Sequence, residues 1–515
     1  MRFAADMKKF LFFLLLACAM LCFLAASAEP AVTFVPENPR MGDYVDVTVT
    51  PGRDGATGVT YTLRVDGEPV FTEGKPVKQF TASFRPRQEG HYTLEVTVSY
   101  GKSDKESVTV DIPVSGQAPA QMGPDVVYSQ RDGWWKDKIY NKKHHRSLQK
   151  AGCAIFTLSH ALQRIGVDPE LCQPETLATA YARFYVEERG TNNEGLILAA
   201  GKDFDFNTSG DVITGEKEVV SCLRRGDLLS VGHVLGHIAL LNGVSEDGKY
   251  VHVVDSALSA TYERLASRKA NIGHIYYRNE DGSFTEAVTP DQLPGLRWFF
   301  ETQEYGGAEY WMTSDYIGKK DMRLIRPHWL FADLGNGPAG VSVEYAGAMV
   351  TKVSRDDQSA RVDTRSLKLA DGSAPRVALV TGKKGTKLTD SNGKALSGVS
   401  RCEYGSMILL LASQDGSLYG YKNGSFGYVK AEDVEVLAPA AEGFRTGMIS
   451  VNGKTSGSTE ITAHKNPKAS SVAVTKWKPG TPVAVVEESE EFLLLEGKGY
   501  RGWVHQKYFT PDQPE

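Results

Sequence analysis

The spacing of apolar residues changes twice along this chain, and each change separates regions that must fold differently. Between residues 31 and 114, apolar and polar residues alternate in short runs, for example at 44–49 and 92–98. An alternation of period two is typical of half-buried β-strands. From about 123 to 335 helix and strand spacings are mixed, and after 375 short β-branched runs with glycine turns follow. Because 515 residues exceed what one hydrophobic core usually serves, we expect several domains.

These regions predict a multidomain protein of the α+β class. We assign 31–115 to an immunoglobulin-like β-sandwich, because short strands recur there at regular spacing, and we interpret it as a spacer. Residues 123–335 are expected to form the mixed α+β domain. Two small β-barrels are expected at 375–438 and 444–511, where an apolar strand, a polar loop and a terminal aromatic strand recur and indicate a weak internal repeat.

The N-terminus has the pattern of a secretory signal peptide at 1–28. Lysines and an arginine precede an apolar run at 10–24, and the small residues Ala26-Ser27-Ala28 follow it. An uncleaved anchor is the alternative, since the apolar segment is nearly long enough to span a bilayer. No second segment of this kind occurs, so we expect a secreted, extracytoplasmic protein, associated with the cell surface or free, without an integral membrane domain once the signal is removed.

Charge and cysteine content exclude several classes of function. The net charge of -5 provides no basic surface for nucleic acid. Outside the signal segment only four cysteines remain, too few for a disulfide framework, and whether Cys172 pairs with Cys222 stays open. His144-His145 has no carboxylate or cysteine at metal-ligand spacing, so we expect neither a metal nor a cofactor.

The strongest local signal for chemistry is a cysteine at the start of a predicted helix. After Cys153, apolar residues recur at helical spacing as far as Ile165, and Gly166 is a natural stop. A helix N-terminus favours the thiolate, which is the nucleophilic form of the side chain. The alternative is that Cys153 is simply a small residue of the core.

A histidine and an aspartate on one predicted hairpin could serve such a thiolate. One strand begins at His237, and the next strand ends at Asp255 after a turn. A carboxylate beside the histidine fixes its tautomer and stabilises the imidazolium. His233 is a rival for the role of base, whereas His252 has the wrong phase to share the face of Asp255.

Four segments of this region resemble a known family. They are Tyr128-Ser129-Gln130-Arg131-Asp132-Gly133-Trp134, Gly152-Cys153-Ala154-Ile155, Gly236-His237 and Val254-Asp255, which look like the four marks of the bacteriocin-peptidase-like branch of papain-like cysteine proteases. The resemblance implies a papain-like fold, with Cys153 as nucleophile, His237 as base and acid, and Asp255 orienting the histidine. It also assigns an oxyanion-hole donor to Gln130. Gly133 and Ser256 depart from the family, which often has proline there.

The aromatic residues that follow this region have no assigned chemistry. We interpret them as core or as the wall of a cleft; they are Trp298, Phe299, Phe300, Tyr305, Tyr310 and Trp311. The two C-terminal segments resemble bacterial SH3-like domains, the second more closely through Gly502-Trp503-Val504. That resemblance implies binding of cell-wall peptide or glycan, here peptidoglycan, or packing against a catalytic domain.

Together these features predict a secreted cysteine peptidase that cleaves peptide bonds in protein or in cell-wall peptide, with SH3-like domains for surface binding. The alternative is a catalytically inactive papain-like protein that binds a surface. The sequence leaves open whether an acyl-enzyme would be resolved by water or by an amine, and which substrate is cleaved.

Overall fold

The computed structural model describes residues 29–512, with short gaps along the chain. The gaps fall at 120–125, 144, 188–189, 209–211, 267–272, 336, 356–357, 371, 391–392, 397–398 and 415–416. The predicted signal peptide therefore lies outside the described residues. Strands make up 43% of the structure and helices 17%, so the protein is mainly β, and its several separate sheets agree with a multidomain chain. None of the helices in the described part is long and apolar enough to cross a membrane.

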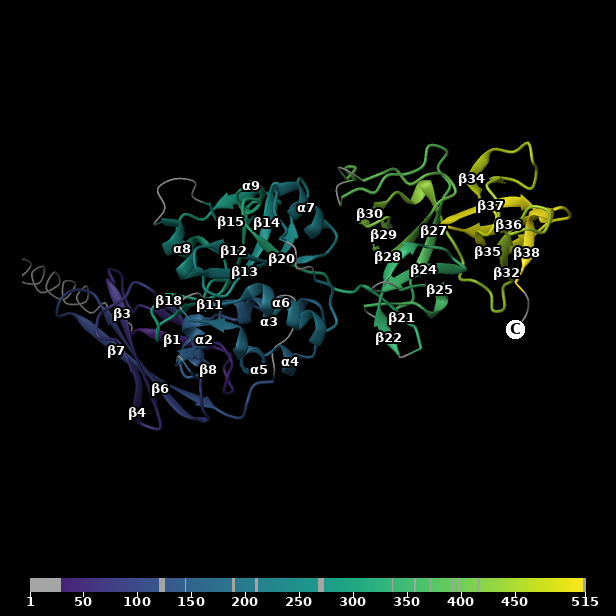
Figure 1. Ribbon diagram of the computed structural model, residues 1–515. Coiled ribbons are helices and arrows are strands. Elements are labelled where there is room, and N and C mark those ends of the chain that lie inside the picture. The colour runs from purple at the N-terminus through teal and green to yellow at the C-terminus, as the bar shows by residue number, and fades with distance from the viewer. Residues whose placement is uncertain are drawn as a thin grey trace, which may run out of the picture.

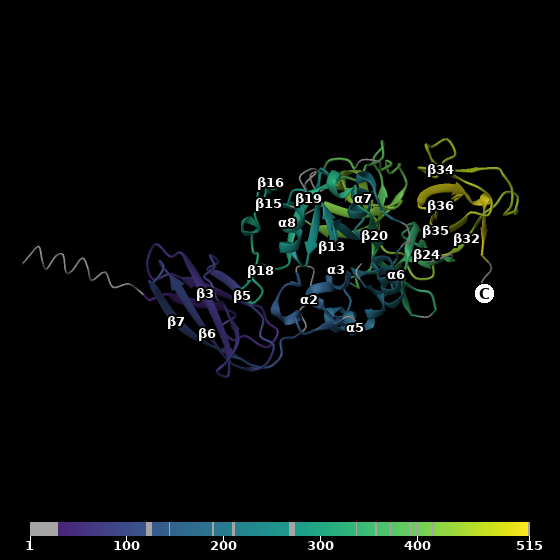
Figure 2. The same ribbon diagram turned by 60° about the vertical axis from the view of Figure 1, so that its left-hand side comes forward.

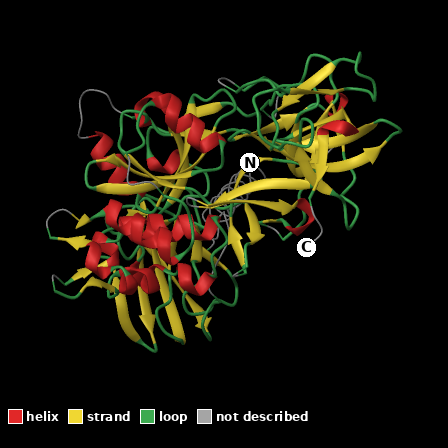
Figure 3. Ribbon diagram, turned by 45° about the vertical axis from the view of Figure 1, so that its right-hand side comes forward, coloured by secondary structure: helices red, strands yellow, loops and turns green. Residues whose placement is uncertain are grey.

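The chain runs through its parts in order from one end of the molecule to the other (Figures 1 and 2). Helices gather in the middle part, as Figure 3 shows, and the flanking parts are almost entirely strands and loops. The N-terminal part contains two facing sheets that share one core. Its seven strands are β1 (Ala31–Val35), β2 (Val45–Thr50), β3 (Gly58–Val65), β4 (Glu68–Thr72), β5 (Thr81–Phe84), β6 (Gly90–Ser99) and β7 (Lys105–Val114).

A hairpin from the middle part completes the N-terminal sandwich. Strands β17 (Trp298–Phe299) and β18 (Glu304–Tyr305) extend the sheet β1-β2-β5, with Phe299 pairing parallel to Ser83. Phe300 is fully buried in the sandwich core and stacks on Tyr61 at 5.1 Å between ring centroids. The sandwich is therefore not packed as an independent domain, because it shares a sheet and a core with the middle part. Its role as a spacer stays a prediction.

The middle part is an antiparallel seven-stranded sheet with helices on both faces. Its strands follow the order β16-β15-β19-β14-β13-β12-β20. They are β12 (Leu228–Val234), β13 (His237–Val244), β14 (Tyr250–Asp255), β15 (Tyr276–Arg278), β16 (Phe284–Glu286), β19 (Ala308–Thr313) and β20 (Met322–Ile325). Alternate residues of the strands enter different cores: Leu240 faces the core of helix α3 (Cys153–Arg164), and Leu241 faces that of helix α7 (Glu216–Arg224). This alternation follows from the period of two along a strand.

The remaining elements of the middle part cover these two faces. With α3 lie α4 (Pro169–Cys172), α5 (Pro174–Ala180) and α6 (Asn193–Asp203), and with α7 lie α8 (Leu258–Ala266) and α9 (Ser314–Ile317). Four small elements precede α3, namely the 3₁₀ turn η1 (Gly133–Trp135), β8 (Ile139–Asn141), β9 (Arg146–Ser147) and the one-turn helix α2 (Leu148–Ala151). Two further short strands, β10 (Tyr185–Val186) and β11 (Gly190–Thr191), form a separate ribbon.

Two three-stranded sheets that the sequence analysis did not predict follow the middle part. One contains β21 (Leu330–Asp333), β22 (Pro338–Gly340) and β26 (Lys368–Leu369), and the other β23 (Ser342–Tyr345), β24 (Val350–Arg355) and β25 (Gln358–Asp363). Their apolar residues share a core with Val377 and Leu409 of the next sheet. They are therefore packed against the C-terminal region and do not form a linker.

The last two regions repeat one strand order. The first is β30-β29-β28-β27-β31, from β27 (Arg376–Val380), β28 (Met407–Gln414), β29 (Ser417–Lys422), β30 (Ser425–Val429) and β31 (Val434–Val436). The second contains β37-β36-β35-β32-β38, from β32 (Thr446–Ile449), β35 (Pro482–Glu488), β36 (Phe492–Gly497), β37 (Tyr500–His505) and β38 (Phe509–Pro511), with β33 (Ile461–His464) and β34 (Ala473–Trp477) beside β37. A short 3₁₀ turn precedes the last strand in both. The internal repeat that the sequence indicates is thus present in the topology.

Candidate active site

Helix α3 begins at Cys153 and is the central helix of its core. Its residues from Ala154 to Gln163 are all buried, so the position of the helix is fixed by packing on every side. Gly152 precedes it, and a Cβ there would lie 2.6 Å from the carbonyl oxygen of Leu148, so a larger residue would displace the turn that leads to Cys153. The cysteine itself is only partly buried, which leaves the thiol accessible.

His237 connects Cys153 to Asp255. Its Nε2 lies 2.6 Å from Oδ1 of Asp255, and the imidazole is also close enough to the thiol of Cys153 for each group to shift the pKa of the other. Because Nε2 is used for the carboxylate, Nδ1 is the nitrogen left to face the sulfur. The hairpin explains the approach: Leu240 pairs with Val254, so Asp255 stands one step further along, diagonal to His237 and on the same face. The structure thus places Asp255 against His237 and His237 beside Cys153.

Electrostatics in this group favour a thiolate paired with an imidazolium. Burial alone would raise the pKa of the Cys153 thiol, but the hydrogen bond and charge of His237, with the backbone groups of Ile238 and Ala154, lower it overall. Burial would lower the pKa of His237, yet Asp255 and Cys153 raise it to about 9. The pKa of Asp255 is held well below its usual range, against the effect of burial, chiefly by His237.

Asp255 is fixed by donors that the sequence analysis missed. Its Oδ2 accepts hydrogen bonds from Thr261 Oγ1 at 2.6 Å and from the Tyr310 hydroxyl at 2.9 Å, and its Oδ1 accepts one from the backbone N–H of Ala257 at 2.8 Å. All of these groups are fully or nearly fully buried. Every lone-pair direction of the carboxylate is thus used, and its orientation toward His237 is set by packing as well as by charge.

Replacing Thr261 with valine is expected to destabilise the protein by about 1.5–3 kcal/mol, because a buried carboxylate would lose one of its donors. The shape of the side chain is kept, so the loss reports on the hydrogen bond. Urea unfolding monitored by tryptophan fluorescence measures it. Thr179→Val is the matched control, since that threonine is exposed on α5 and bonds only the carbonyl of its own helix. Equal stability of both variants would contradict a role for Thr261 in holding Asp255.

The other candidate histidines do not face the thiol. Nε2 of His233 lies 2.9 Å from the Tyr310 hydroxyl, and burial lowers the pKa of His233 to about 4, so it remains neutral. Nδ1 of His252 lies 2.6 Å from the amide oxygen of Asn242, and the ring packs on Trp311. His233 therefore lies behind the group, bonded to Tyr310 and 3.9 Å from Oδ2 of Asp255, and His252 bonds to Asn242 instead.

Gln130 is buried beside the active-site helix, but its amide is already engaged. Its Nε2 donates to the carbonyl oxygens of Leu148 and Gln149 at 3.2 and 3.0 Å, and its Oε1 accepts from the hydroxyl of Ser256. Its own backbone N–H donates to the carbonyl of Ser256 at 2.7 Å. The side chain thus ties the turn before Cys153 to the residue after Asp255, and an oxyanion would have to compete with these carbonyls for its N–H groups.

The N-terminal sandwich holds the segment that carries Gln130. The hydroxyl of Tyr44 accepts a hydrogen bond from the backbone N–H of Ser129, and Arg85 reaches the buried carboxylate of Asp132 at 3.6 Å. The guanidinium of Arg85 is enclosed by four aromatic rings, at 4.7–6.0 Å from their centroids, which belong to Tyr44, Tyr128, Trp134 and Trp135. The sequence gives no sign of this contact, because its partners lie in different domains.

The remaining cysteines and the predicted aromatic residues have structural positions. Cys172, Cys222 and Cys402 are buried free thiols, and Cys172 and Cys222 belong to different cores. Among the described residues no group of three histidine, cysteine or acidic side chains could hold a metal ion. Of the aromatic residues after the hairpin, Trp298 and Phe300 enter the sandwich core and Tyr310 belongs to the buried group around Asp255. Trp311 lies apart from both and packs on His252 and Phe284.

Comparisons with known proteins give only distant similarities. No protein-family model and no curated protein matches the sequence. Among solved structures, NlpC2 and NlpC1 from Trichomonas vaginalis align with 26% of this chain at 10% and 13% identity, each with a TM-score of 0.11. The alignments cover 48% and 45% of those proteins, so less than half of each is matched. A structure described as carbohydrate-binding modules of the β-sandwich superfamily aligns with 58% of the chain at 9% identity and a TM-score of 0.14. Scores of this size carry no weight for fold or activity.

Proposed function

We propose that this protein is a secreted cysteine peptidase whose papain-like middle domain uses Cys153 as nucleophile, His237 as base and acid, and Asp255 to orient the histidine. The observation that supports the proposal is the buried His237–Asp255 hydrogen bond of 2.6 Å beside Cys153 at the start of α3, where His237 lowers the pKa of the thiol. A thiol that served only as core would need neither the imidazole nor the carboxylate behind it.

The arrangement can carry out acyl transfer in two steps. The Cys153 thiolate attacks the carbonyl carbon of a peptide bond, and the oxyanion is stabilised by the backbone N–H of Cys153 and an N–H of Gln130. Protonated His237 gives its proton to the departing amine as the carbon–nitrogen bond breaks, leaving a thioester. His237, now neutral, takes a proton from water, whose oxygen displaces the sulfur and regenerates the thiolate.

The hydrogen bonds that the Gln130 amide already makes favour one alternative, a catalytically inactive surface-binding protein. If its amide stays on the carbonyls of Leu148 and Gln149, the oxyanion is left with the helix N-terminus alone, and the domain would serve as an inactive surface-binding fold. Removal of one oxyanion donor typically lowers kcat by about 10²–10³-fold. The rate of peptide hydrolysis therefore distinguishes the peptidase from the inactive binding protein.

The substrate class is the open part of this proposal. The repeated C-terminal regions, which we assign to SH3-like domains, would bring the middle domain to a cell surface and to peptidoglycan peptides. Purified protein incubated with peptidoglycan and, separately, with casein distinguishes the substrates by the masses of the released fragments. New amino termini identify hydrolysis, whereas fragments extended by an added amine identify transfer. Binding to peptidoglycan with no fragment from either substrate would contradict the peptidase and support the binding protein.

The rate of hydrolysis is expected to follow a bell-shaped dependence on pH. Activity should rise as the lowered pKa of Cys153 is passed, because the thiolate then forms, and fall as the pH passes about 9, because His237 loses the proton needed by the departing amine. Initial rates of peptide cleavage between about pH 5 and pH 10.5 measure both limbs. In Asp255→Asn the descending limb should move to lower pH, since the main charge that raises the pKa of His237 is gone. An unmoved limb would contradict the assignment of that limb to His237.

A further inference from the structure

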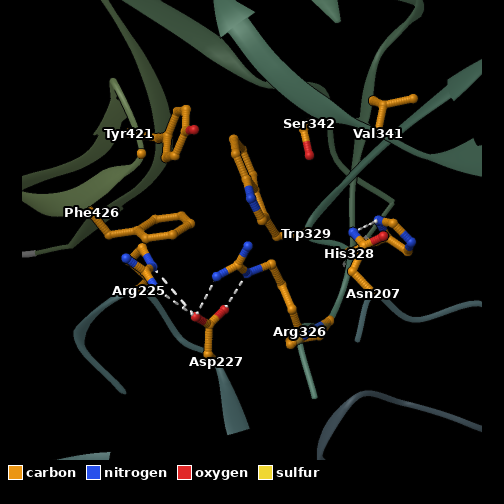
Figure 4. A pocket seen from close by; sticks show the side chains of 12 residues that line it. Asn207, Arg225, Asp227, Arg326, His328, Trp329, Val341, Ser342, Tyr421 and Phe426 are labelled. Carbon is orange, nitrogen blue, oxygen red and sulfur yellow. Dashed lines mark hydrogen bonds and ion pairs between the residues drawn. The ribbon is translucent and has the colours of Figure 1, made fainter. Parts of the chain in front are cut away.

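A cavity of about 220 Å³ lies between the middle domain and the C-terminal sheets. Figure 4 shows the side chains that line it, and three groups of them carry the argument. Arg225 and Asp227 lie just before β12, Arg326 and Trp329 lie in the segment that links β20 to β21, and Tyr421 and Phe426 belong to β29 and β30. None of these residues takes part in the site around Cys153.

The charged side of the cavity carries a surplus of positive charge. Asp227 is 3% exposed and accepts from two guanidinium groups. Arg326 binds it through Nε at 2.8 Å and Nη2 at 3.0 Å, and Arg225 binds it through Nε at 3.3 Å and Nη2 at 3.2 Å. One carboxylate thus faces two cations. The bonds of Arg326 to Asp227 use its Nε and Nη2, and the side chain is 41% exposed.

The opposite side of the cavity consists of aromatic rings. Trp329 packs against Tyr421 at 4.8 Å and against Phe426 at 5.4 Å between ring centroids, and all three side chains are only partly buried. The guanidinium of Arg326 lines the same cavity as the rings of Phe426 and Trp329, as Figure 4 shows. Aromatic ring faces and guanidinium groups therefore line the same cavity. The rings attract an apolar part of a ligand, and the guanidinium groups attract an anionic part.

We propose that this cavity binds a small ring that carries a carboxylate, the ring resting on the aromatic side chains and the carboxylate meeting Arg326 and Arg225. The volume limits the ligand to a single ring with its substituents, because sites for larger, drug-sized ligands measure about 300–1,000 Å³. Guanidinium donors match the two oxygens of a carboxylate, and the surplus charge makes an acid preferable to its amide. Two kinds of ligand share this chemistry: a sugar acid, and an aromatic residue at the C-terminus of a peptide. The inference does not depend on the peptidase proposal.

Binding is tested on the full chain by ligand-observed NMR titration with four probes. Glucuronic acid represents the sugar acid, and N-acetyltyrosine represents the C-terminal aromatic residue. Glucuronamide and N-acetyltyrosine amide are their neutral counterparts. We expect one of the acids to bind with a Kd on the order of 1 mM. The Kd of its amide should be at least about tenfold higher. The acid that binds identifies the source of the ring. Equal binding of acid and amide, or no binding of either acid at 20 mM, would overturn the proposal.

Variants separate the roles of the two sides of the cavity. Arg225→Met leaves Asp227 paired with Arg326, so the fold is retained while the surplus charge is lost, and the acid should bind about tenfold more weakly. Phe426→Leu removes a ring face and should weaken the acid and the amide alike. Arg376→Met and Phe284→Leu make the same changes at an exposed arginine and at a stacked ring outside the cavity, and they should leave binding unchanged. Loss of binding in these controls, or full binding by Arg225→Met, would contradict the site.

Discussion

Replacing Cys153 with alanine is expected to abolish covalent labelling by thiol-reactive peptide probes and to lower peptide hydrolysis by about 10⁴-fold or more. Cys153 is the partly exposed thiol of the described chain, and its pKa is lowered by His237 despite burial. Without the sulfur no thioester can form, and the remaining groups can only bind substrate. Mass spectrometry of the labelled protein and the rate of fragment release measure the two effects separately.

Cys172→Ala is the matched control for this prediction. Cys172 is buried, and burial raises the pKa of its thiol to about 12, so it should not react and its loss should leave labelling intact. The urea midpoint of Cys153→Ala should stay close to that of the wild type, which excludes unfolding as the cause. Labelling that persists in Cys153→Ala, or that disappears in Cys172→Ala, would mean that the nucleophile lies elsewhere.

The parts of the fold and site that depend on neighbouring residues could be predicted from the sequence. The hairpin that carries His237 and Asp255 has a single turn, so its phase sets which side chains share a face. The start of α3 at Cys153 follows from helical spacing and the glycine before it. The repeat of the two C-terminal regions appears in the matching places of their terminal aromatic strands.

Contacts between residues far apart in sequence could not be predicted in this way. Nothing in the aromatic run at 298–300 shows that it enters the core of a domain more than two hundred residues earlier, because an apolar run fits any core. The strands between 330 and 369 are short and carry many polar residues, and they are stabilised by the adjoining sheet. Tyr310 and Thr261 give no signal either, since only the fold makes them donors to Asp255.

The contact between Arg85 and Asp132 joins two domains next to Gln130, and its loss should have a large effect on stability. Asp132 is fully buried and caps the 3₁₀ turn of residues 133–135 by accepting a hydrogen bond from the backbone N–H of Trp134. Burial, together with the charge of Glu301, raises the pKa of Asp132 to about 7, although the charge of Arg85 acts to lower it. Arg85→Met keeps an apolar stem among the rings but removes the cation, so a buried carboxylate would be left without its main counter-charge.

We expect Arg85→Met to destabilise the protein by about 1.4 kcal/mol more near pH 8 than near pH 5.5, because a folded-state pKa of about 7 leaves only about one pH unit over which the ionised carboxylate needs the cation. A raised folded-state pKa means that Asp132 contributes stability below its unfolded pKa of about 3.9, and this contribution is lost as the pH rises through about 7. Removing Arg85 raises the folded pKa further, so the loss continues to higher pH and becomes larger. At the lower pH the carboxyl group is protonated in the folded protein with or without Arg85.

Urea unfolding at the two pH values, on single and double variants, tests this explanation. In Asp132→Asn the penalty of Arg85→Met should be small and equal at both pH values, since no carboxylate remains to be neutralised. Arg53→Met is the control, because that arginine forms an exposed ion pair on the same sandwich and its loss should change little at either pH. Because the turn held by Asp132 follows Gln130, the labelling rate of Cys153 in Arg85→Met should fall at pH 8 and recover at pH 5.5 relative to the wild type. A pH-independent penalty would mean that Arg85 acts only by filling space among the four rings, and that the charge of Asp132 does not couple the sandwich to the active site.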